Sequence, residues 1–229
     1  SYLVKPFNME QLVITVERLL SDHFLILLKQ KQVYCEENRM ILASITGFVE
    51  AMEARNSYRR GHSEAVARLM VQIGQKMNLD TDALDSLIMA GRIHDIGMIG
   101  VPDAIVLKPG KLTDEEFAVV RKHPADGVSI LESVPSIKPL LPVIHQHQER
   151  FDGTGYPDGL KGQEIMLWAR IAAVADTYNA LTSDRPYRPC MSQEAAGQVI
   201  ESVRGTQLCP DCVDAFKKIS ASQISTFRL

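Results

Sequence analysis

The chain has 229 residues, of which 45% are hydrophobic and 23% are charged, and its formal net charge is -3 at pH 7. This length is enough to bury one sizeable core, so we expect one domain with an appendage. The slightly acidic balance provides no global basic field, which argues against non-specific binding to DNA and leaves any anionic substrate to local cations or metals.

The termini and the cysteines bear on the cellular compartment. No apolar run reaches the roughly 18 uncharged residues of a membrane-spanning helix, and residues 1–7 lack the pattern of a signal peptide. We therefore expect a soluble, cytoplasmic protein with no membrane partner. The four cysteines are irregularly spaced, which argues against a disulfide framework. Cys209 and Cys212 have the spacing of half a zinc site, but no second pair completes it, which favours an incidental pair of thiols.

The first predicted element is helical and runs from about residue 9 to residue 55. Apolar residues recur there at helical spacing, and no glycine or proline precedes Gly47. This pattern predicts one long helix or two helices in series. Charged residues give the stretch a solvated side, so it fits an amphipathic helix on its own domain as well as the seam of a homodimer.

Helical periodicity continues downstream, at residues 64–77, 81–93, 113–123, 125–132, 138–148, 168–181 and 192–203. Thr81, Thr113 and Ser192 open three of these segments as capping residues, and Glu116 completes a capping box with Thr113. Proline and glycine mark loops at 101–110, 152–162 and 183–189. Because alternating strand patterns are nearly absent, the sequence predicts an all-α bundle with three conspicuous loops.

The candidate site begins with His94 and Asp95, which close an apolar helix just before Gly97. A desolvated carboxylate needs a cation or several donors, and a metal ion supplies that charge. Further candidates lie at a helix start, before a proline, near a helix end and inside an apolar helix: His62, His123, His147 and Asp176. Four imidazoles and two carboxylates resemble a ligand set for two ions bridged by one carboxylate, and two close ions suit phosphoester hydrolysis.

The order of these residues resembles the HD phosphohydrolase superfamily. His123 and the stretch 147–160, HQERFDGTGYPDGL, are similar to its HD-GYP subgroup. The likeness runs from about residue 51 to about residue 216. It implies an HD-type helical bundle preceded by a long linker helix. It also implies a phosphodiesterase that hydrolyses cyclic di-GMP to linear pGpG and further to GMP.

The resemblance also implies a metal site. One of two divalent ions would be held by His62, His94, Asp95 and Asp176, and the other by Asp95, His123 and His147. The catalytic residues would be His94, Asp95 and Asp176. Iron or manganese is favoured, although histidine and carboxylate ligands also suit nickel and zinc.

The substrate would contact two further groups of residues. Arg185 and Arg188 match positions that bind substrate phosphate, which suits the arginine fork, although both can equally be solvated loop arginines. Gly155 and Tyr156 would shape the signature loop, which belongs to the stretch 147–160. Tyr156 is equally explained as a packing residue.

Three positions depart from the family pattern. Gln148 replaces a histidine and would be a poorer ligand of the second ion, and Met98 replaces a phosphate-binding lysine. Tyr58 stands where some members have a glutamate that helps to bind a third ion, so two ions are expected. The alternative is a degenerate domain that binds cyclic di-GMP or a protein partner with little hydrolysis.

A second resemblance lies at the N-terminus. Lys5-Pro6-Phe7 and the helix after it are similar to the end of a response-regulator receiver domain. The predicted organisation is therefore a receiver remnant at 1–21, a helical linker at 22–50 and the HD-GYP domain at 51–229. It implies the signalling output of a two-component response regulator. The expected partners are cyclic di-GMP, a second copy of the chain through the N-terminal helix, and a GGDEF-type protein through the signature loop.

Overall fold

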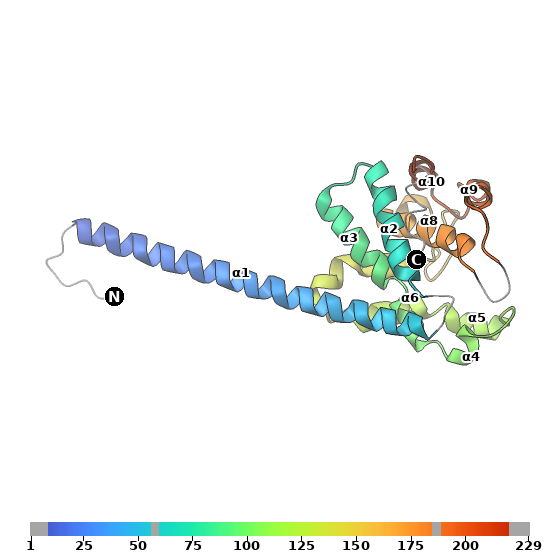
Figure 1. The fold of residues 1–229 in the computed structure, drawn as a ribbon, viewed down its shortest axis with the longest axis horizontal. Coiled ribbons are helices and arrows are strands. Elements are labelled where there is room, and N and C mark those ends of the chain that lie inside the picture. Colours follow the sequence, from blue (N-terminus) through green and yellow to red (C-terminus); the bar gives the residue numbers. More distant parts are fainter. Residues whose placement is uncertain (1–8, 56–59, 185–188, 220–229) are drawn as a thin grey trace. The chain divides into compact units, whose positions relative to one another are not determined.

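The computed structural model describes residues 9–55, 60–184 and 189–219, and in these ranges it consists of helices and connecting loops with no β-strand (Figure 1). This confirms the predicted all-α class. The chain divides into two compact units, residues 1–45 and 46–229. Lys5, Pro6 and Phe7 lie outside the described residues, so the receiver remnant and the predicted segment boundaries stay predictions.

The N-terminal periodicity corresponds to one helix, α1, which spans Met9–Ala54 without a break. Of the two alternatives left open by the sequence, the single helix is therefore correct. Within residues 1–45, large apolar side chains of α1 are exposed, among them Ile14, Leu20 and Phe24 at 63%, 63% and 61%. No described helix combines the length and the hydrophobicity that crossing a membrane requires.

The second unit contains the remaining helices. They are α2 (His62–Lys76), α3 (Thr81–Ile93), α4 (Asp103–Val106), α5 (Asp114–Val120), α6 (His123–Leu131), α7 (Leu141–Gln146), α8 (Leu167–Thr182), α9 (Gln193–Ser202) and α10 (Pro210–Lys217). Three short 3-10 helices separate some of them: η1 (Ile96–Gly100), η2 (Pro135–Leu140) and η3 (Gly162–Glu164).

Several predicted elements need correction. The single helix expected at 138–148 is η2 followed by α7, because Pro139 and Pro142 lack the N–H that a continuous α-helix requires. The cap of α3 is Asp80, which accepts a hydrogen bond from the N–H of Ala83, and not Thr81. The capping box of Thr113 and the cap of Ser192 are confirmed. Helix α10 and the short α4 were not predicted.

The core forms where α2, α3 and α8 pack together (Figure 1). Met70, Leu87, Ile93 and Ile171 are fully buried there, and each contributes roughly 1.5–3 kcal/mol by leaving water. Helices α2 and α3 approach closely because Gly91 has no side chain: a Cβ there would lie 2.4 Å from the Cα of Ala67. The hairpin formed by the two helices brings the start of α2 to the end of α3.

A second close approach joins η1 to α6. A Cβ at Gly97 would lie 1.9 Å from the carbonyl oxygen of His123 and 2.6 Å from the amide nitrogen of Gly127. Only glycine permits this backbone contact, which sets the residues before η1 beside the start of α6. Gly97 was expected to stop a helix, but its structural requirement is this contact.

Candidate metal centre

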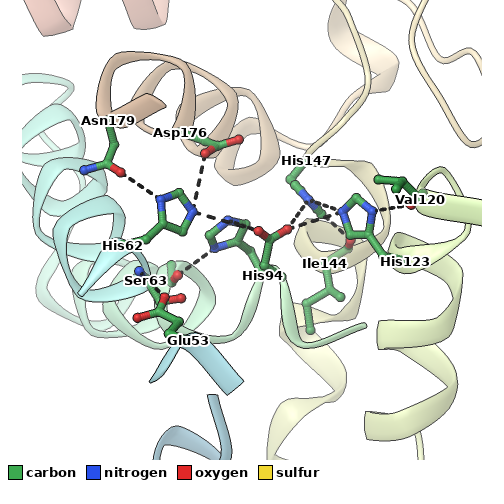
Figure 2. A network of polar contacts seen from close by, with 12 residues as sticks. Glu53, His62, Ser63, His94, Val120, His123, Ile144, His147, Asp176 and Asn179 are labelled. Carbon is green, nitrogen blue, oxygen red and sulfur yellow. Dashed lines mark hydrogen bonds and ion pairs between the residues drawn. The ribbon is translucent and has the colours of Figure 1, made fainter. Parts of the chain in front are cut away.

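Four buried histidines come together at helix ends. His94 follows α3, His123 begins α6 and His147 follows α7, and in each the Nδ1–H donates to the carbonyl oxygen three residues earlier, at 2.7, 2.7 and 2.8 Å. His62, the first residue of α2, donates from Nδ1 to Oδ1 of Asn179 at 2.7 Å (Figure 2). These bonds place the proton of each ring on Nδ1, so all four Nε2 atoms are unprotonated, as in metal-binding histidines.

Asp95 lies among these four Nε2 atoms. Its Oδ1 is 3.3 Å from the Nε2 of both His123 and His147. Its Oδ2 is 3.7 Å from Nε2 of His94 and 3.9 Å from Nε2 of His62. The carboxylate therefore belongs to two groups of ligand atoms, one with His62 and His94 and one with His123 and His147, each within 4.8 Å. We call these five residues the histidine cluster.

The cluster fits divalent metal ions better than it fits a metal-free core. The Nε2 atoms of His62 and His94 are buried and have no hydrogen-bond partner among the described residues. The Nε2 atoms of His123 and His147 face each other at 3.1 Å, and two lone pairs at that distance repel unless a cation lies near them. Burial also lowers the pKa of His147, which keeps its imidazole neutral and able to bind a metal.

Asp176 is placed differently from the expectation. It was predicted to be buried on an apolar face of its helix, but its side chain is 25% exposed because it faces an open pocket. Asp176 lies one helical turn before Asn179 on α8. Its Oδ1 is 3.5 Å from Nε2 of His62 (Figure 2). Helix α8 thus brings a carboxylate and an amide to the same ring. Asn179 was not among the site residues predicted from the sequence.

Glu53 was also missed. Its side chain is buried, and its two oxygens accept hydrogen bonds from the N–H groups of Gly61 at 2.9 Å and Ser63 at 2.7 Å. A carboxylate at the start of a helix satisfies orphan donors and interacts well with the helix dipole. Glu53 therefore fixes the first turn of α2, and with it His62. It lies eight residues before Gly61, beyond the three-residue spacing of a local cap, so a capping pattern could not reveal it.

The pocket beside the cluster has a volume of about 780 Å³, which is in the range of sites for sizeable ligands. It is lined by His147, Gln148, Gly155, Tyr156, Asp176 and Arg121, among others. Arg185 and Arg188, predicted to bind phosphate, lie outside the described residues. Met98 lines a small cavity together with His62 and Asp95, so the position expected to carry a lysine does lie at the site.

Arg121 is a pocket residue that the sequence did not suggest. Its guanidinium carbon lies 4.9 Å from the ring centroid of Tyr156 and 5.9 Å from that of Phe117. Tyr156 itself packs edge-to-face against His123, with ring centroids 6.4 Å apart. Burial raises the pKa of Tyr156 to about 12, so its hydroxyl stays protonated. Tyr156 therefore both packs and lines the pocket.

The signature loop is held by buried and charged groups. Oε1 of Glu149 accepts hydrogen bonds from the N–H groups of Asp158 and Gly159, at 2.7 and 3.1 Å. Gly155 is required by close approach, since a Cβ would lie 2.3 Å from the amide nitrogen of Arg150. Arg150 donates to Asp152 at 3.0 Å, which together with bonds from Thr154 holds the pKa of Asp152 well below its usual range.

His145 and Gln148 are close to His147 in the sequence, and the structure places both residues. Nε2 of His145 lies 3.0 Å from Oδ2 of Asp158, so this ring bonds to the signature loop and not to the histidine cluster. Gln148 lines the pocket, and its backbone carbonyl oxygen accepts a hydrogen bond from the backbone N–H of Tyr156 at 3.3 Å.

Four buried imidazoles around one carboxylate in a helical bundle are typical of metal-binding proteins. The model of the HD domain family matches residues 16–211, and the chain belongs to this family, which confirms the resemblance inferred from the motifs. Among similar proteins, the cyclic di-GMP phosphodiesterase response regulator RpfG of Xanthomonas campestris is 36% identical over 174 residues, covering 75% of this chain and 46% of that protein.

Two further comparisons involve Vibrio cholerae. The 3'3'-cGAMP-specific phosphodiesterase 3 is 38% identical over 174 residues, covering 76% of this chain and 38% of that protein. The crystal structure of a cyclic GMP-AMP specific phosphodiesterase shares the fold, with a TM-score of 0.62 at 16% identity, and the match covers 82% of this chain and 50% of that chain. The chain thus spans less than half the length of the two sequence relatives.

Proposed function

We propose that the chain is a metal-dependent phosphodiesterase that hydrolyses cyclic di-GMP to linear pGpG, with GMP as a further product. The observation that carries this proposal is the position of Asp95, between two pairs of imidazoles whose Nε2 atoms all point inward. The adjoining pocket has room for a dinucleotide, and the relatives' names support the substrate class.

The geometry of the histidine cluster supports the following metal assignment. We assign one ion to His62, His94, Asp95 and Asp176, and a second to Asp95, His123 and His147. Bound there, two divalent ions would neutralise the phosphodiester and supply a nucleophile at neutral pH. Iron or manganese is our preference, and nickel and zinc suit the same ligands. Gln148 lies at the pocket and would be a weak additional ligand of the second ion.

The residues of the chain would share the remaining work. Asp176 is partly exposed to the pocket, so its carboxylate can orient a water molecule and accept its proton. Arg121, whose charge lies over the ring of Tyr156, would hold a phosphate oxygen of the substrate. Arg185 and Arg188 stay predicted phosphate contacts, and Gly155 leaves the backbone of the signature loop open to the substrate.

Asp95→Asn is the central test. The amide keeps the volume but removes the bridging charge, so we expect loss of both ions and loss of cyclic di-GMP hydrolysis. The matched control is Asp85→Asn, which changes an exposed carboxylate on α3 and should leave metal content and turnover unchanged. Hydrolysis by Asp95→Asn at the wild-type rate, with both ions retained, would sink the proposal.

The competing function is a receptor that binds cyclic di-GMP without hydrolysing it, as the departures Met98 and Gln148 suggest. Turnover and binding measured on the metal-loaded wild-type chain separate the two: tight binding with no product would favour the receptor. A large rate increase in Gln148→His with Met98→Lys would indicate a weakened enzyme. The same assay with 3'3'-cGAMP decides between the substrates named for the relatives.

We also propose that α1 forms a homodimer. Leu20, Leu27 and Ile41 are exposed, and the spacings between them are 7 and 14 residues. Phe24 is also exposed and lies three residues before Leu27, so the pattern is that of a coiled-coil seam. Light scattering should show a dimer that becomes a monomer in Leu20→Glu with Leu27→Glu, whereas Lys29→Glu should stay dimeric. A wild-type monomer at high concentration would contradict this assignment.

The remaining assignments concern the cellular role. We propose that the chain acts in the cytoplasm as the output of a response regulator, and that the signature loop is the surface for a GGDEF-type partner. A pull-down of a purified GGDEF-type protein with this chain, repeated with Asp158→Ala and Lys161→Ala, tests the loop surface. Equal capture by the variants and the wild type would contradict it.

A further inference from the structure

A second cluster of reactive groups lies at the start of α10. Cys209 is the residue before α10 and Cys212 lies one turn into it, and both are buried, with 2% and 0% of their surface exposed. Cys209 and Cys212 are three residues apart at the start of α10, and a hydrogen bond between their side chains is the largest influence on the pKa of each. Cysteines at this spacing across the first turn of a helix can be joined by a disulfide when their sulfurs approach each other.

The surroundings of Cys209 favour its thiolate. Nη1 of Arg170, on α8, donates to Sγ of Cys209 at 3.5 Å. Within the described ranges, Nε of Arg170 is buried and has no hydrogen-bond partner, so the sulfur of Cys209 is an acceptor that the structure provides for this guanidinium. The hydrogen bond from Cys212 lowers the pKa of Cys209, with Arg170 adding to the effect, and the same bond raises the pKa of Cys212.

This arrangement separates two chemical roles. A cysteine beside an arginine and at the start of a helix is the nucleophile of a thiol pair, and a neighbouring protonated thiol resolves the oxidised product. Cys190, in contrast, is exposed and not part of the pair. The chain therefore contains an internal control for thiol reactivity.

We propose that Cys209 and Cys212 form an oxidation site in which peroxide converts the two thiols into an intrachain disulfide. The Cys209 thiolate attacks one oxygen of hydrogen peroxide, the O–O bond breaks, hydroxide leaves and Cys209 becomes a sulfenic acid. The Cys212 sulfur then attacks the Cys209 sulfur, the S–S bond forms, the S–O bond breaks and the proton of Cys212 leaves with the oxygen as water. Two thiols are oxidised and one peroxide is reduced.

Burial determines which oxidant can act. Because the pair is almost completely covered, a molecule close to water in size can reach it, whereas oxidised glutathione cannot approach the Cys209 sulfur in the required line. The site therefore responds to peroxide and is insensitive to disulfide reagents. This selectivity distinguishes it from an exposed cysteine such as Cys190, which both kinds of reagent modify.

The pair adjoins the signature loop. Thr206 and Gln207, just before Cys209, accept through their carbonyl oxygens the N–H groups of Asp152 and Phe151, at 2.8 and 3.1 Å. Gln207 also lines the pocket. Oxidation of Cys209 thus takes place two residues from backbone bonds that hold the loop.

The test treats the full chain with hydrogen peroxide or with oxidised glutathione, blocks the remaining thiols and maps the peptides by mass spectrometry. We expect peroxide to give a Cys209–Cys212 linked peptide that is lighter by two hydrogens, and glutathione to modify Cys190 but neither Cys209 nor Cys212. In Cys212→Ser the reaction should stop at a sulfenic acid on Cys209, which dimedone traps. Cys209→Ser should leave Cys212 reduced, and Cys190→Ser should react at the wild-type rate.

Arg170 provides a variant that probes the electrostatics. Arg170→Met should slow the oxidation of Cys209 about tenfold, whereas Arg170→Lys keeps a positive charge and should stay close to the wild type. Peroxide that modifies Cys190 while Cys209 and Cys212 stay reduced would overturn the proposal. So would tight zinc binding by the pair with protection of both thiols. Because Cys190→Ser leaves the pair intact, it gives a disulfide result even if the other variants fail to fold.

Discussion

Replacing Gly97 with alanine is expected to pull the two halves of the histidine cluster apart. The added Cβ would lie 1.9 Å from the carbonyl oxygen of His123, and ordinary contact begins at 3.4 Å. Helices η1 and α6 would therefore have to separate by about 1.5 Å, the difference between these two distances. The clash involves backbone on both sides, so no side-chain rotation can relieve it.

The consequence for the site follows from what each helix carries. Asp95 precedes η1 and His123 begins α6, and the 3.3 Å between Oδ1 and Nε2 depends on their contact. Ligand distances in metal sites tolerate only about 0.2 Å. We expect the proposed second ion to bind more weakly or not at all, and the free energy of unfolding to fall by about 3 kcal/mol, as for an overpacked core.

Urea unfolding of the metal-free chain and metal analysis of the loaded chain measure the two effects. The control is Gly197→Ala in α9, where nothing lies within 4 Å of the added Cβ and a gain of up to about 1 kcal/mol is expected. If Gly97→Ala matched the wild type in both stability and metal content, the argument from backbone contact would be wrong.

Three further changes give separate readouts. If cyclic di-GMP is the substrate as proposed, Arg121→Met should raise its KM about tenfold with little change in kcat, because the proposed phosphate contact would be removed. An unchanged KM in steady-state kinetics would contradict this. Glu53→Ala should lower the free energy of unfolding by about 3 kcal/mol, since two N–H groups lose their acceptor, while Glu50→Ala on the same helix should change it by less than about 0.5 kcal/mol; equal values in denaturant titrations would refute the capping role. Asp152→Asn should cost about 1 kcal/mol near neutral pH, because the charge that accepts from Arg150 is lost. The pKa of Asp152 is depressed, so its contribution is complete above the ordinary value of 3.8 and is lost as the pH falls through the folded-state pKa; a cost in thermal melts that did not decrease in acid would contradict this.

Much of the helical framework could be predicted from periodicity. The span 81–93 agrees with α3, and the span 168–181 differs from α8 by one residue at each end, because apolar spacing is a local signal. Pro139 and Pro142 also predict a break within residues 138–148, where a single helix was expected. Helix α10 was not predicted because it is short, and because Cys209 and Cys212 at its start were interpreted only as an incidental pair of thiols.

The site was predicted in part. His62, His94, Asp95, His123 and His147 do come together, since the order of the motifs reflects a fold in which helix ends meet. Their roles as ligands stay predictions.

Other contributors to the site left no local trace. Glu53, Asn179 and Arg121 reach it through tertiary packing, and each is an ordinary polar residue in an ordinary helix. No spacing rule connects them to the histidines.

The hydrogen bonds of the imidazoles imply an order in which the site would come undone. Three of the rings are oriented by a carbonyl of their own turn, so they keep their aim as long as that turn persists. His62 alone depends on a distant helix, through Asn179. A loosening of α8 would release this ring and the adjacent Asp176 together, while the half of the cluster with His123 and His147 stayed assembled. If two ions bind as proposed, partial denaturation should therefore yield a species that retains one ion, and the ion lost first would be the one nearer to α8.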